Sequence, residues 1–267
     1  MDTWRVDDEL EMNLEDVRRV VVRIVAGDVT VTAGSSPRIE VVRESGSPVD
    51  VMIRDGVLSV LQPDADTAPL ERIVKWFTEG RRHRCTVVIT APPDVSIDVT
   101  TVSAPVIASG FRGGARVKTV SADVTLNGLG SQVDVKTVSG DVEAKGIAAE
   151  LKLKSVSGDM SVVDGACRWV DAKSVSGDVL LDLDLDPAGT YDVKTVSGGV
   201  GVRTIADPNL SVEASTVSGD VVSDFGLDFE HRPGRRHLYD TIGEGGARLR
   251  VKTVSGDLRV LRGRIAA

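Results

Sequence analysis

One short phrase recurs along this chain and constrains its fold more than any other feature. It reads T/S-V-S-G-D in its commonest form, as in TVSGDV at 137–142 and SVSGDV at 174–179. Successive copies are 18, 18, 18, 19, 21, 21 and 37 residues apart, counted between their central serines, and IVAGDV at 24–29 reads as a degenerate ninth copy. The central serines are Ser103, Ser121, Ser139, Ser157, Ser176, Ser197, Ser218 and Ser255. Such a constant period predicts one structural unit stacked many times.

The period favours an all-β fold. Strands rise about 3.3 Å per residue, so 18 residues trace roughly 60 Å, which fits one turn of a parallel β-solenoid with two or three short faces. Abundant Val and Thr, with a Gly in almost every unit, oppose helical repeats. The period is also too short for a βαβ unit or a four-stranded propeller blade. We therefore predict a single-stranded parallel β-solenoid with rungs of 18–21 residues, right-handed by analogy with other single-stranded β-helices.

The ends of the chain depart from this regularity. Residues 1–90 are expected to form an irregular β portion, and residues 91–265 the regular repeats. Two insertions interrupt them, at 64–84 and 222–247. The first has the apolar spacing of an amphipathic helix, whereas the second lengthens the last period to nearly two units and predicts a hairpin or loop in place of one rung. The apolar residues of the predicted helix face are Leu70, Ile73, Val74 and Phe77.

Within each unit, the phrase is expected to contain a corner. The valines on both sides of the glycine are predicted to stack inward, with Val120, Val138, Val156 and Val175 forming one buried column. The glycines are expected to supply a bend with positive φ, because glycine adopts that conformation without steric strain. These corner glycines are Gly140, Gly158, Gly177, Gly198, Gly219 and Gly256.

A row of aspartates follows the glycines and admits two interpretations. Calcium binding would neutralise the row, but one carboxylate per rung supplies too few of the six to eight oxygens that calcium prefers. Alternatively, each carboxylate accepts backbone N–H groups at the corner, and a parallel row of lysines relieves the repulsion. We favour this structural role and predict no metal site. The two rows are Asp123, Asp141, Asp159, Asp178, Asp220 and Asp257, and Lys118, Lys136, Lys154, Lys173, Lys194 and Lys252.

The two insertions are the candidate contact sites. They combine arginines with most of the few aromatic residues, a composition typical of protein-contact patches and of elements that lie on anionic surfaces. The alternative is that they cap the open ends of the solenoid. The candidate partner-binding residues are Arg72, Lys75, Trp76, Arg81, Arg82, Arg84, Arg232, Arg235, Arg236 and Tyr239.

Several function classes are disfavoured by composition and motifs. A net charge of -8 argues against a surface built for nucleic acid, and no run of 18 apolar residues predicts a transmembrane helix. The N-terminal sequence lacks a secretory leader, and Cys85 and Cys167 follow no metal or redox spacing, so we expect free thiols in a cytoplasmic protein. Catalysis and cofactors are not expected, because the acids recur with the repeat and the histidines lie in the insertions without H-E-x-x-H spacing.

The repeat also carries a family resemblance. The T/S-V-S-G-D phrases, the strand TVVITAPP at 86–93 and the lead GEGGARLR at 243–250 resemble a bacterial family of β-strand-repeat proteins known as "putative adhesins". The resemblance covers residues 20–262. It implies the repeat fold and a domain of unknown function, common in actinobacteria, with no catalytic residues to transfer.

The function expected from these observations is a non-enzymatic scaffold or interaction module, adhesin-like, that meets a protein partner or an anionic surface through its insertions. Two alternatives stay open. One is a carbohydrate-binding or carbohydrate-processing β-helix at the cell envelope, which a cluster of non-repeating acids and aromatics on one face would favour. The other is self-association by end-to-end stacking into a polymer.

Overall fold

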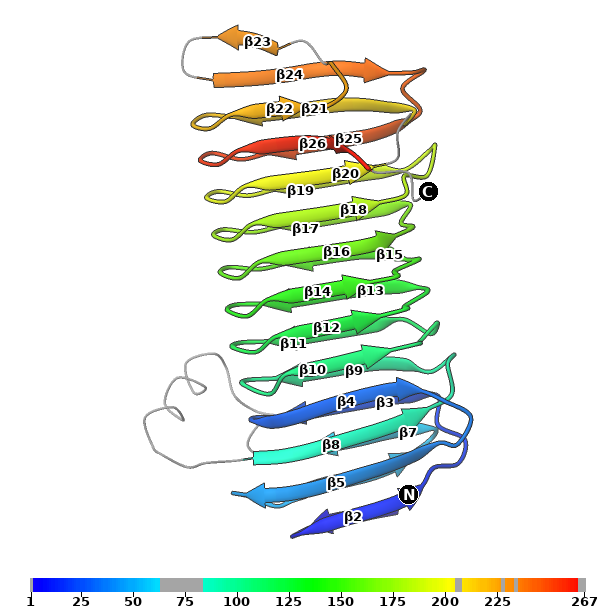
Figure 1. The fold of residues 1–267 in the computed structure, drawn as a ribbon. Coiled ribbons are helices and arrows are strands. Elements are labelled where there is room, and N and C mark those ends of the chain that lie inside the picture. The colour runs from blue at the N-terminus through cyan, green and yellow to red at the C-terminus, as the bar shows by residue number, and fades with distance from the viewer. Residues whose placement is uncertain (1, 63–83, 205–207, 227–228, 233–234, 264–267) are drawn as a thin grey trace. The chain divides into compact units, whose positions relative to one another are not determined.

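The computed structural model describes residues 2–62, 84–204, 208–226, 229–232 and 235–263 (Figure 1). Every regular element in these ranges is a β-strand, which confirms the predicted all-β class. The described part of the chain has no helix that could span a membrane. The helix predicted within 64–84 lies outside the described residues, except that Arg84 begins a strand. The chain divides into two compact units, residues 1–131 and residues 132–267.

The first unit contains two sheets, each with a run of parallel pairs followed by a run of antiparallel pairs. β3 and β4 pair in parallel with β9 and β10, which pair in turn with β11 and β12. On the other side of β3 and β4 the sheets continue through antiparallel pairs, β7-β6-β1 in one sheet and β8-β5-β2 in the other. The strands are β1 (Asp2–Val6), β2 (Glu9–Asn13), β3 (Arg19–Ile24), β4 (Gly27–Ala33), β5 (Arg38–Ser45), β6 (Val49–Arg54), β7 (Val57–Leu61), β8 (Arg84–Ala91), β9 (Ser96–Thr101), β10 (Val106–Ser109), β11 (Ala115–Thr119) and β12 (Val124–Asn127).

The degenerate copy of the phrase at 24–29 occupies a regular corner in the first unit. Val29 on β4 is in register with Val106 on β10, which is in register with Val124 on β12. Gly27 has a φ of 121°, and a Cβ added there would meet the backbone of Cys85. The ninth copy predicted from the sequence is therefore confirmed.

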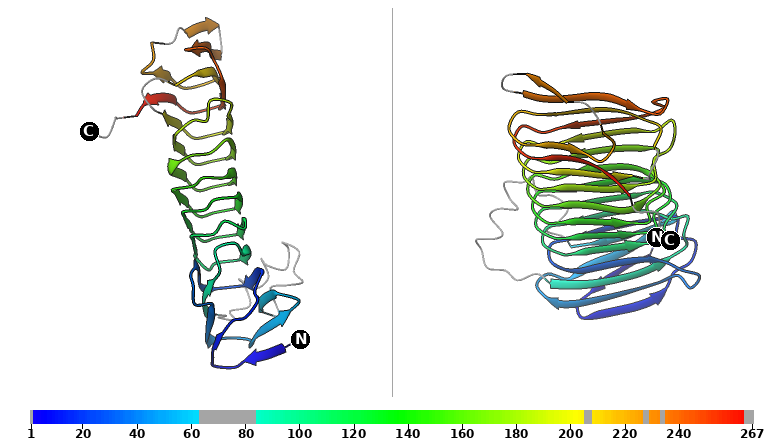
Figure 2. Two further views of the ribbon diagram at one scale, coloured as in Figure 1. Left: turned by 90° about the vertical axis from the view of Figure 1, so that its right-hand side faces the viewer. Right: turned by 45° about the horizontal axis from the view of Figure 1, so that its top comes forward.

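The second unit consists of two sheets, and from β13 to β20 successive strands of the chain belong alternately to one sheet and the other. Odd-numbered strands from β13 to β19 form one parallel ladder and even-numbered strands from β14 to β20 form the other (Figures 1 and 2). The strands are β13 (Gln132–Thr137), β14 (Val142–Lys145), β15 (Glu150–Lys154), β16 (Met160–Gly165), β17 (Trp169–Lys173), β18 (Val179–Leu183), β19 (Thr190–Lys194), β20 (Val200–Thr204), β21 (Leu210–Thr216), β22 (Val221–Ser223), β23 (Phe229–Arg232), β24 (Arg235–Ile242), β25 (Ala247–Lys252) and β26 (Leu258–Arg262).

The core of the second unit lies between its two sheets. Side chains alternate along β13 to β20, so the inward face of each of these strands is buried and the outward face is the more exposed one. Leu151 and Leu153 on β15 are fully buried, as are Val162 on β16 and Leu181 on β18. Burial of such aliphatic side chains contributes about 1.5–3 kcal/mol each. The outward positions are thereby left free for function.

The repeated phrase forms the corner between the two sheets. Ser139, Ser157, Ser176 and Ser197 pair in parallel with one another as isolated bridges. The six predicted corner glycines have φ between 139° and 152°, in the region that favours glycine, so the glycine corner is confirmed. Gly158 has a second constraint, because an added Cβ would lie 2.3 Å from the carbonyl oxygen of Gly140.

The predicted column of buried valines is wrong. Val138, Val156 and Val175 are exposed, and Val120 is half-buried. The preceding residue, such as Thr137, faces the core instead, and alternation then turns the next side chain outward. Only the valine after the aspartate is buried as predicted, at Val124, Val142 and Val179. Two corner hydroxyls donate to backbone carbonyls, Thr195 to Gly198 at 3.1 Å and Thr216 to Gly256 at 3.1 Å.

The last repeat does not follow the order of the chain. β25 lies between β19 and β21, and β26 lies between β20 and β22, with parallel pairing on both sides. The insertion at 222–247 supplies the hairpin β23–β24, whose second strand pairs antiparallel with β21. A hairpin in this insertion was predicted. The prediction that all repeats stack in sequence order is wrong, because β25 and β26, which follow the insertion, pair between the two repeats that precede it.

Candidate binding face

The corner aspartates are part of the scaffold. Oδ1 of Asp141 accepts the backbone N–H of Asp159 at 2.8 Å, and Oδ1 of Asp159 accepts that of Asp178 at 2.8 Å. Asp178 accepts the N–H of Gly199 at 2.7 Å in the same way. These bonds between rungs confirm the structural role predicted for the carboxylates. Across the described residues, no group of three or more His, Cys, Asp or Glu side chains is placed to hold a metal ion.

The outward face of the odd-numbered strands carries a continuous row of lysines, here called the lysine column. In-register pairing places one lysine beside the next from β13 through β25, about 4.8 Å apart. Basic side chains outnumber acidic ones at the outward positions of these five strands, although the whole chain has a net charge of -8. The lysine column consists of Lys136, Lys154, Lys173, Lys194 and Lys252.

Lysines of the column form ion pairs with acids on the outward face of their own strands. Lys173 Nζ lies 2.8 Å from Oδ1 of Asp171, and Lys194 Nζ lies 2.8 Å from Oδ2 of Asp192. The reason is geometric: residues two apart on one strand share a face, whereas the corner aspartate lies beyond the turn. The pairs leave the ammonium groups partly exposed, so the column can still attract anions.

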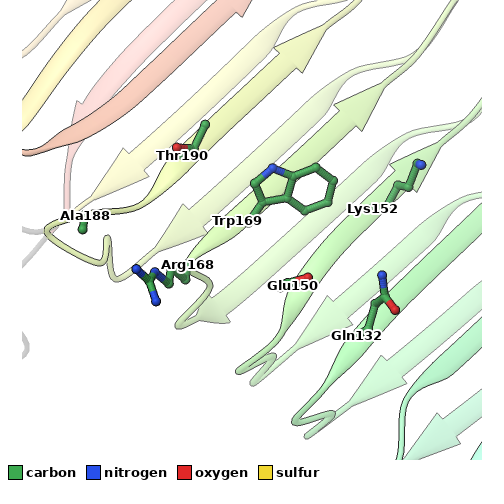
Figure 3. Close-up of a pocket in the computed structure, with 7 residues that line it drawn as sticks. All are labelled: Gln132, Glu150, Lys152, Arg168, Trp169, Ala188 and Thr190. Carbon is green, nitrogen blue, oxygen red and sulfur yellow. The ribbon is translucent and has the colours of Figure 1, made fainter.

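A shallow groove lies beside the lysine column at the starting ends of the same strands (Figure 3). Its volume is about 430 Å³. In Figure 3 the indole of Trp169 lies at its centre, with Arg168 and Ala188 on one side and Lys152 on the other. The indole is 36% exposed, although tryptophan is normally well buried. The lining residues are Gln132, Glu150, Lys152, Arg168, Trp169, Ala188 and Thr190.

The wall of the groove near Ala188 is held by a buried tyrosine. The Tyr191 hydroxyl donates to the carbonyl of Cys167 at 2.7 Å and accepts the N–H of Asp186 at 2.8 Å. Oδ1 of Asp186 accepts the N–H of Ala188 at 2.8 Å, which closes a tight turn. Burial raises the pKa of Tyr191 to about 12, so its hydroxyl keeps the donated proton. The turn next to Trp169 is therefore fixed before any ligand arrives.

The cysteines do not provide a reactive group at this face. Cys85 and Cys167 are free and buried, as predicted for free thiols. Burial, with a smaller effect of Glu44, raises the pKa of Cys85 to about 12, and burial also raises the pKa of Cys167. Since the thiolate is the nucleophile, neither thiol is activated.

Comparison with known proteins places the chain in a family. The model of the Toastrack DUF4097 family matches residues 17–261. The chain belongs to this family. The resemblance noted from the repeat is thereby supported at the level of the Toastrack fold. No curated protein matches the chain.

One of the similar solved structures supports the same fold for this Toastrack protein. A "putative adhesin" from Bacteroides fragilis is 12% identical, with a TM-score of 0.52 over 95% of this chain and 97% of that chain. A "putative adhesin" from Parabacteroides distasonis is 11% identical, with a TM-score of 0.42 over 95% and 98% of the two chains. A "putative lipid binding protein" from the same species is 9% identical, with a TM-score of 0.39 over 97% and 98%. At these identities the first structure supports the fold alone.

The structure locates some of the contact residues predicted in the insertions. Arg84 begins β8 and lies 3.8 Å from Glu44, and Tyr239 on β24 is 69% exposed. Arg232 is on β23, and Arg235 and Arg236 are on β24, which places these arginines on the terminal hairpin. The remaining candidates lie outside the described residues and comprise Arg72, Lys75, Trp76, Arg81 and Arg82.

Sequence reasoning missed the groove around Trp169. Two signals could have found it. Trp169 is a lone aromatic at the start of a repeat strand, and it lies within a period lengthened to 19 residues that is followed by one of 21. The additional residues lie at a register shift within β16 and in the connection 184–189. Arg168 follows β16, Ala188 belongs to that connection, and both line the groove.

The ion pairs of Glu213, on β21 next to β25, predict that the stability of the fold depends on pH. Glu213 lies 2.9 Å from Nζ of Lys252 and 2.8 Å from Nε of Arg250, and these two partners lower its pKa from the ordinary 4.5. A pKa lowered on folding stabilises the folded state above pH 4.5, and this contribution is lost as the pH falls through the lowered value. Glu213→Gln should therefore lower stability by about 0.5 kcal/mol near neutral pH and by almost nothing at about pH 2.

Urea denaturation at the two pH values measures this difference. Glu143→Gln, an exposed change on β14, is the control. An equal effect of Glu213→Gln at both pH values would contradict the ion-pair explanation.

Proposed function

We propose that this Toastrack protein is a non-enzymatic, adhesin-like module that binds an anionic surface through its lysine column. The observation that carries the proposal is the basic excess on one outward face of an acidic chain. Lysines at about 4.8 Å intervals present a regular line of charge, which suits an extended anionic partner better than a small ligand. The corner acids Asp141, Asp159 and Asp178 accept bonds between rungs, which supports a structural role for them.

The scaffold proposed for this module is a single-stranded, right-handed parallel β-solenoid. Its support is the alternation of the chain between two parallel ladders, with each strand paired to the strand two places along. Right-handed connections are strongly preferred between parallel strands of one sheet. Such a scaffold keeps the lysines in line without a cofactor or a metal.

The end-to-end polymer has less support. Parallel stacking of a second copy would require a regular rung at the end of the second unit. The hairpin β23–β24 instead continues one sheet with antiparallel pairs, and β23 has only four residues. Short, antiparallel terminal strands are a common way to discourage edge-to-edge association.

Flotation with lipid vesicles tests the proposal. Vesicles of phosphatidylcholine alone are compared with vesicles that also contain phosphatidylglycerol, at low and at high salt. Each lysine near an anionic surface contributes about 1 kcal/mol, so replacing all five lysines of the column with glutamine should weaken binding at least about tenfold. Binding should also fall at high salt.

Two further variants locate the contact. Replacement of Lys145, Arg203 and Arg259 with glutamine removes charge from the outward face of the other sheet and should leave binding unchanged. A six-arginine variant tests the insertions and replaces Arg81, Arg82, Arg84, Arg232, Arg235 and Arg236. Binding that is equal on both kinds of vesicle would contradict the proposed function. Loss confined to the six-arginine variant would move the contact from the lysine column to the insertions.

A further inference from the structure

We propose that the groove around Trp169 binds a saccharide, with one sugar ring stacked on the exposed indole. This site goes beyond the binding of an anionic surface, because it uses an aromatic side chain and hydrogen bonds to sugar hydroxyls and not a line of positive charge. The groove is the one described place where outward side chains on these strands stop repeating. In-register positions beside Trp169 carry Glu150 on β15 and Thr190 on β19, whereas the lysine column is uniform across the same strands.

The loss of repetition coincides with extra chain. A register shift within β16, between Val162 and Gly165, and the connection 184–189 lengthen two successive repeats to 19 and 21 residues. Arg168, which follows β16, and Ala188, in that connection, both line the groove. A regular scaffold gains nothing from these additions, since neighbouring rungs pair in register without them. Departures in two neighbouring rungs that meet at one exposed tryptophan indicate a built recognition site.

The composition of the groove matches a sugar better than a protein. A pyranose has an apolar face of C–H groups and a rim of hydroxyls, and an indole face attracts the slightly positive C–H groups. Glu150, Gln132 and Thr190 supply acceptors and donors for hydroxyls around the indole. Protein hot spots instead cluster several anchors in well-packed pockets that exclude water. This groove is shallow, and Trp169 is the sole large apolar side chain at the described outward positions of β13, β15, β17 and β19.

The site is also rigid. The turn that carries Ala188 is fastened through Asp186 to the buried hydroxyl of Tyr191. Gly189 completes the turn where an added Cβ would lie 2.4 Å from that hydroxyl. Trp169 itself projects from a paired strand. A preformed site lowers the entropy lost on binding, which matters for a ligand held by one ring contact and a few hydrogen bonds.

Calorimetric titration with four soluble hexasaccharides tests the proposal. The probes are chitohexaose, cellohexaose, xylohexaose and maltohexaose, which differ in ring substituents and in linkage. At least one should bind the parent protein. Trp169→Ala should weaken that binding by at least about tenfold, the range found when an aromatic stacking partner is removed, and Trp169→Phe should retain part of it.

Matched controls separate the site from general effects. Tyr239→Ala removes another exposed aromatic, on β24, and should leave saccharide binding unchanged. Trp169→Ala should bind phosphatidylglycerol vesicles as the parent does, so failure here is distinct from failure of the proposed function. Circular dichroism checks that each variant is folded. If no hexasaccharide binds the parent, or if Trp169→Ala binds as tightly as the parent, the proposal is wrong.

Discussion

Replacement of Gly158 by alanine is expected to destabilise the protein by about 3 kcal/mol or more. Gly158 has a φ of 142°, and a side chain in such a conformation carries about 1–3 kcal/mol of strain. The added Cβ would also lie 2.3 Å from the carbonyl oxygen of Gly140, in the backbone of the next rung. That backbone is fixed by the bridge between Ser139 and Ser157, so the overlap cannot be relieved by a side-chain rotation.

Gly199→Ala is the control for this experiment. Gly199 is in the corner two rungs away, but its added Cβ would meet its nearest atoms at 3.5 Å, an ordinary contact, and it does not have positive φ. Alanine there should leave stability unchanged or raise it by about 0.5 kcal/mol, because it restricts the unfolded chain. Urea denaturation followed by circular dichroism measures both variants. Equal midpoints for the two alanine variants would remove the corner explanation.

Val179→Asp is expected to prevent folding of the second unit. Val179 is 1% exposed and lies between Met160 and Val200 in the ladder of even-numbered strands. A carboxylate placed there has neither water nor a cationic partner, and an unpaired buried charge destabilises by several kcal/mol. The variant should therefore be insoluble or lack the circular dichroism spectrum of the parent.

Val175→Asp makes the same chemical change four residues earlier and should be tolerated. Val175 is 49% exposed at the corner, so its replacement should change stability by less than about 1 kcal/mol. The pair tests which valine of the phrase belongs to the core. If Val175→Asp unfolds the protein and Val179→Asp does not, the assignment of the two faces is inverted.

The repeat period and its residue types were enough to predict the all-β class and the glycine corners. Both depend on local rules, namely the pairing of β-branched segments and the backbone freedom of glycine. The outward direction of Val175 was not predictable in the same way. It depends on where the strand ends, and a shift of one residue moves a side chain to the opposite face. The Thr or Ser before each of these valines is buried, as at Thr137, Ser155 and Ser174. The residue types alone did not indicate that this polar side chain, and not the valine, faces the core.

The candidate site was harder to predict because its residues are far apart in sequence. Glu150, Trp169 and Thr190 meet only because three rungs pair in register. Each is unremarkable in its own repeat, and the lengthened connections beside them resemble ordinary loop variation. The arginines and aromatics of segment 222–247 instead predicted a contact site there, and the structure shows a terminal hairpin in that segment.

The placement of β25 and β26 has a consequence for synthesis of the chain. β21 pairs with β25 and β24, and β25 in turn separates it from β19. During translation the strands β21 and β22 emerge before residues 247–262, so their final parallel neighbours do not yet exist. The end of the second unit therefore closes only after residues 247–262 have been made, when β25 and β26 pair between two repeats that were synthesised earlier. Strands β25 and β26 thus complete this end of the second unit, because they pair with strands on both sides.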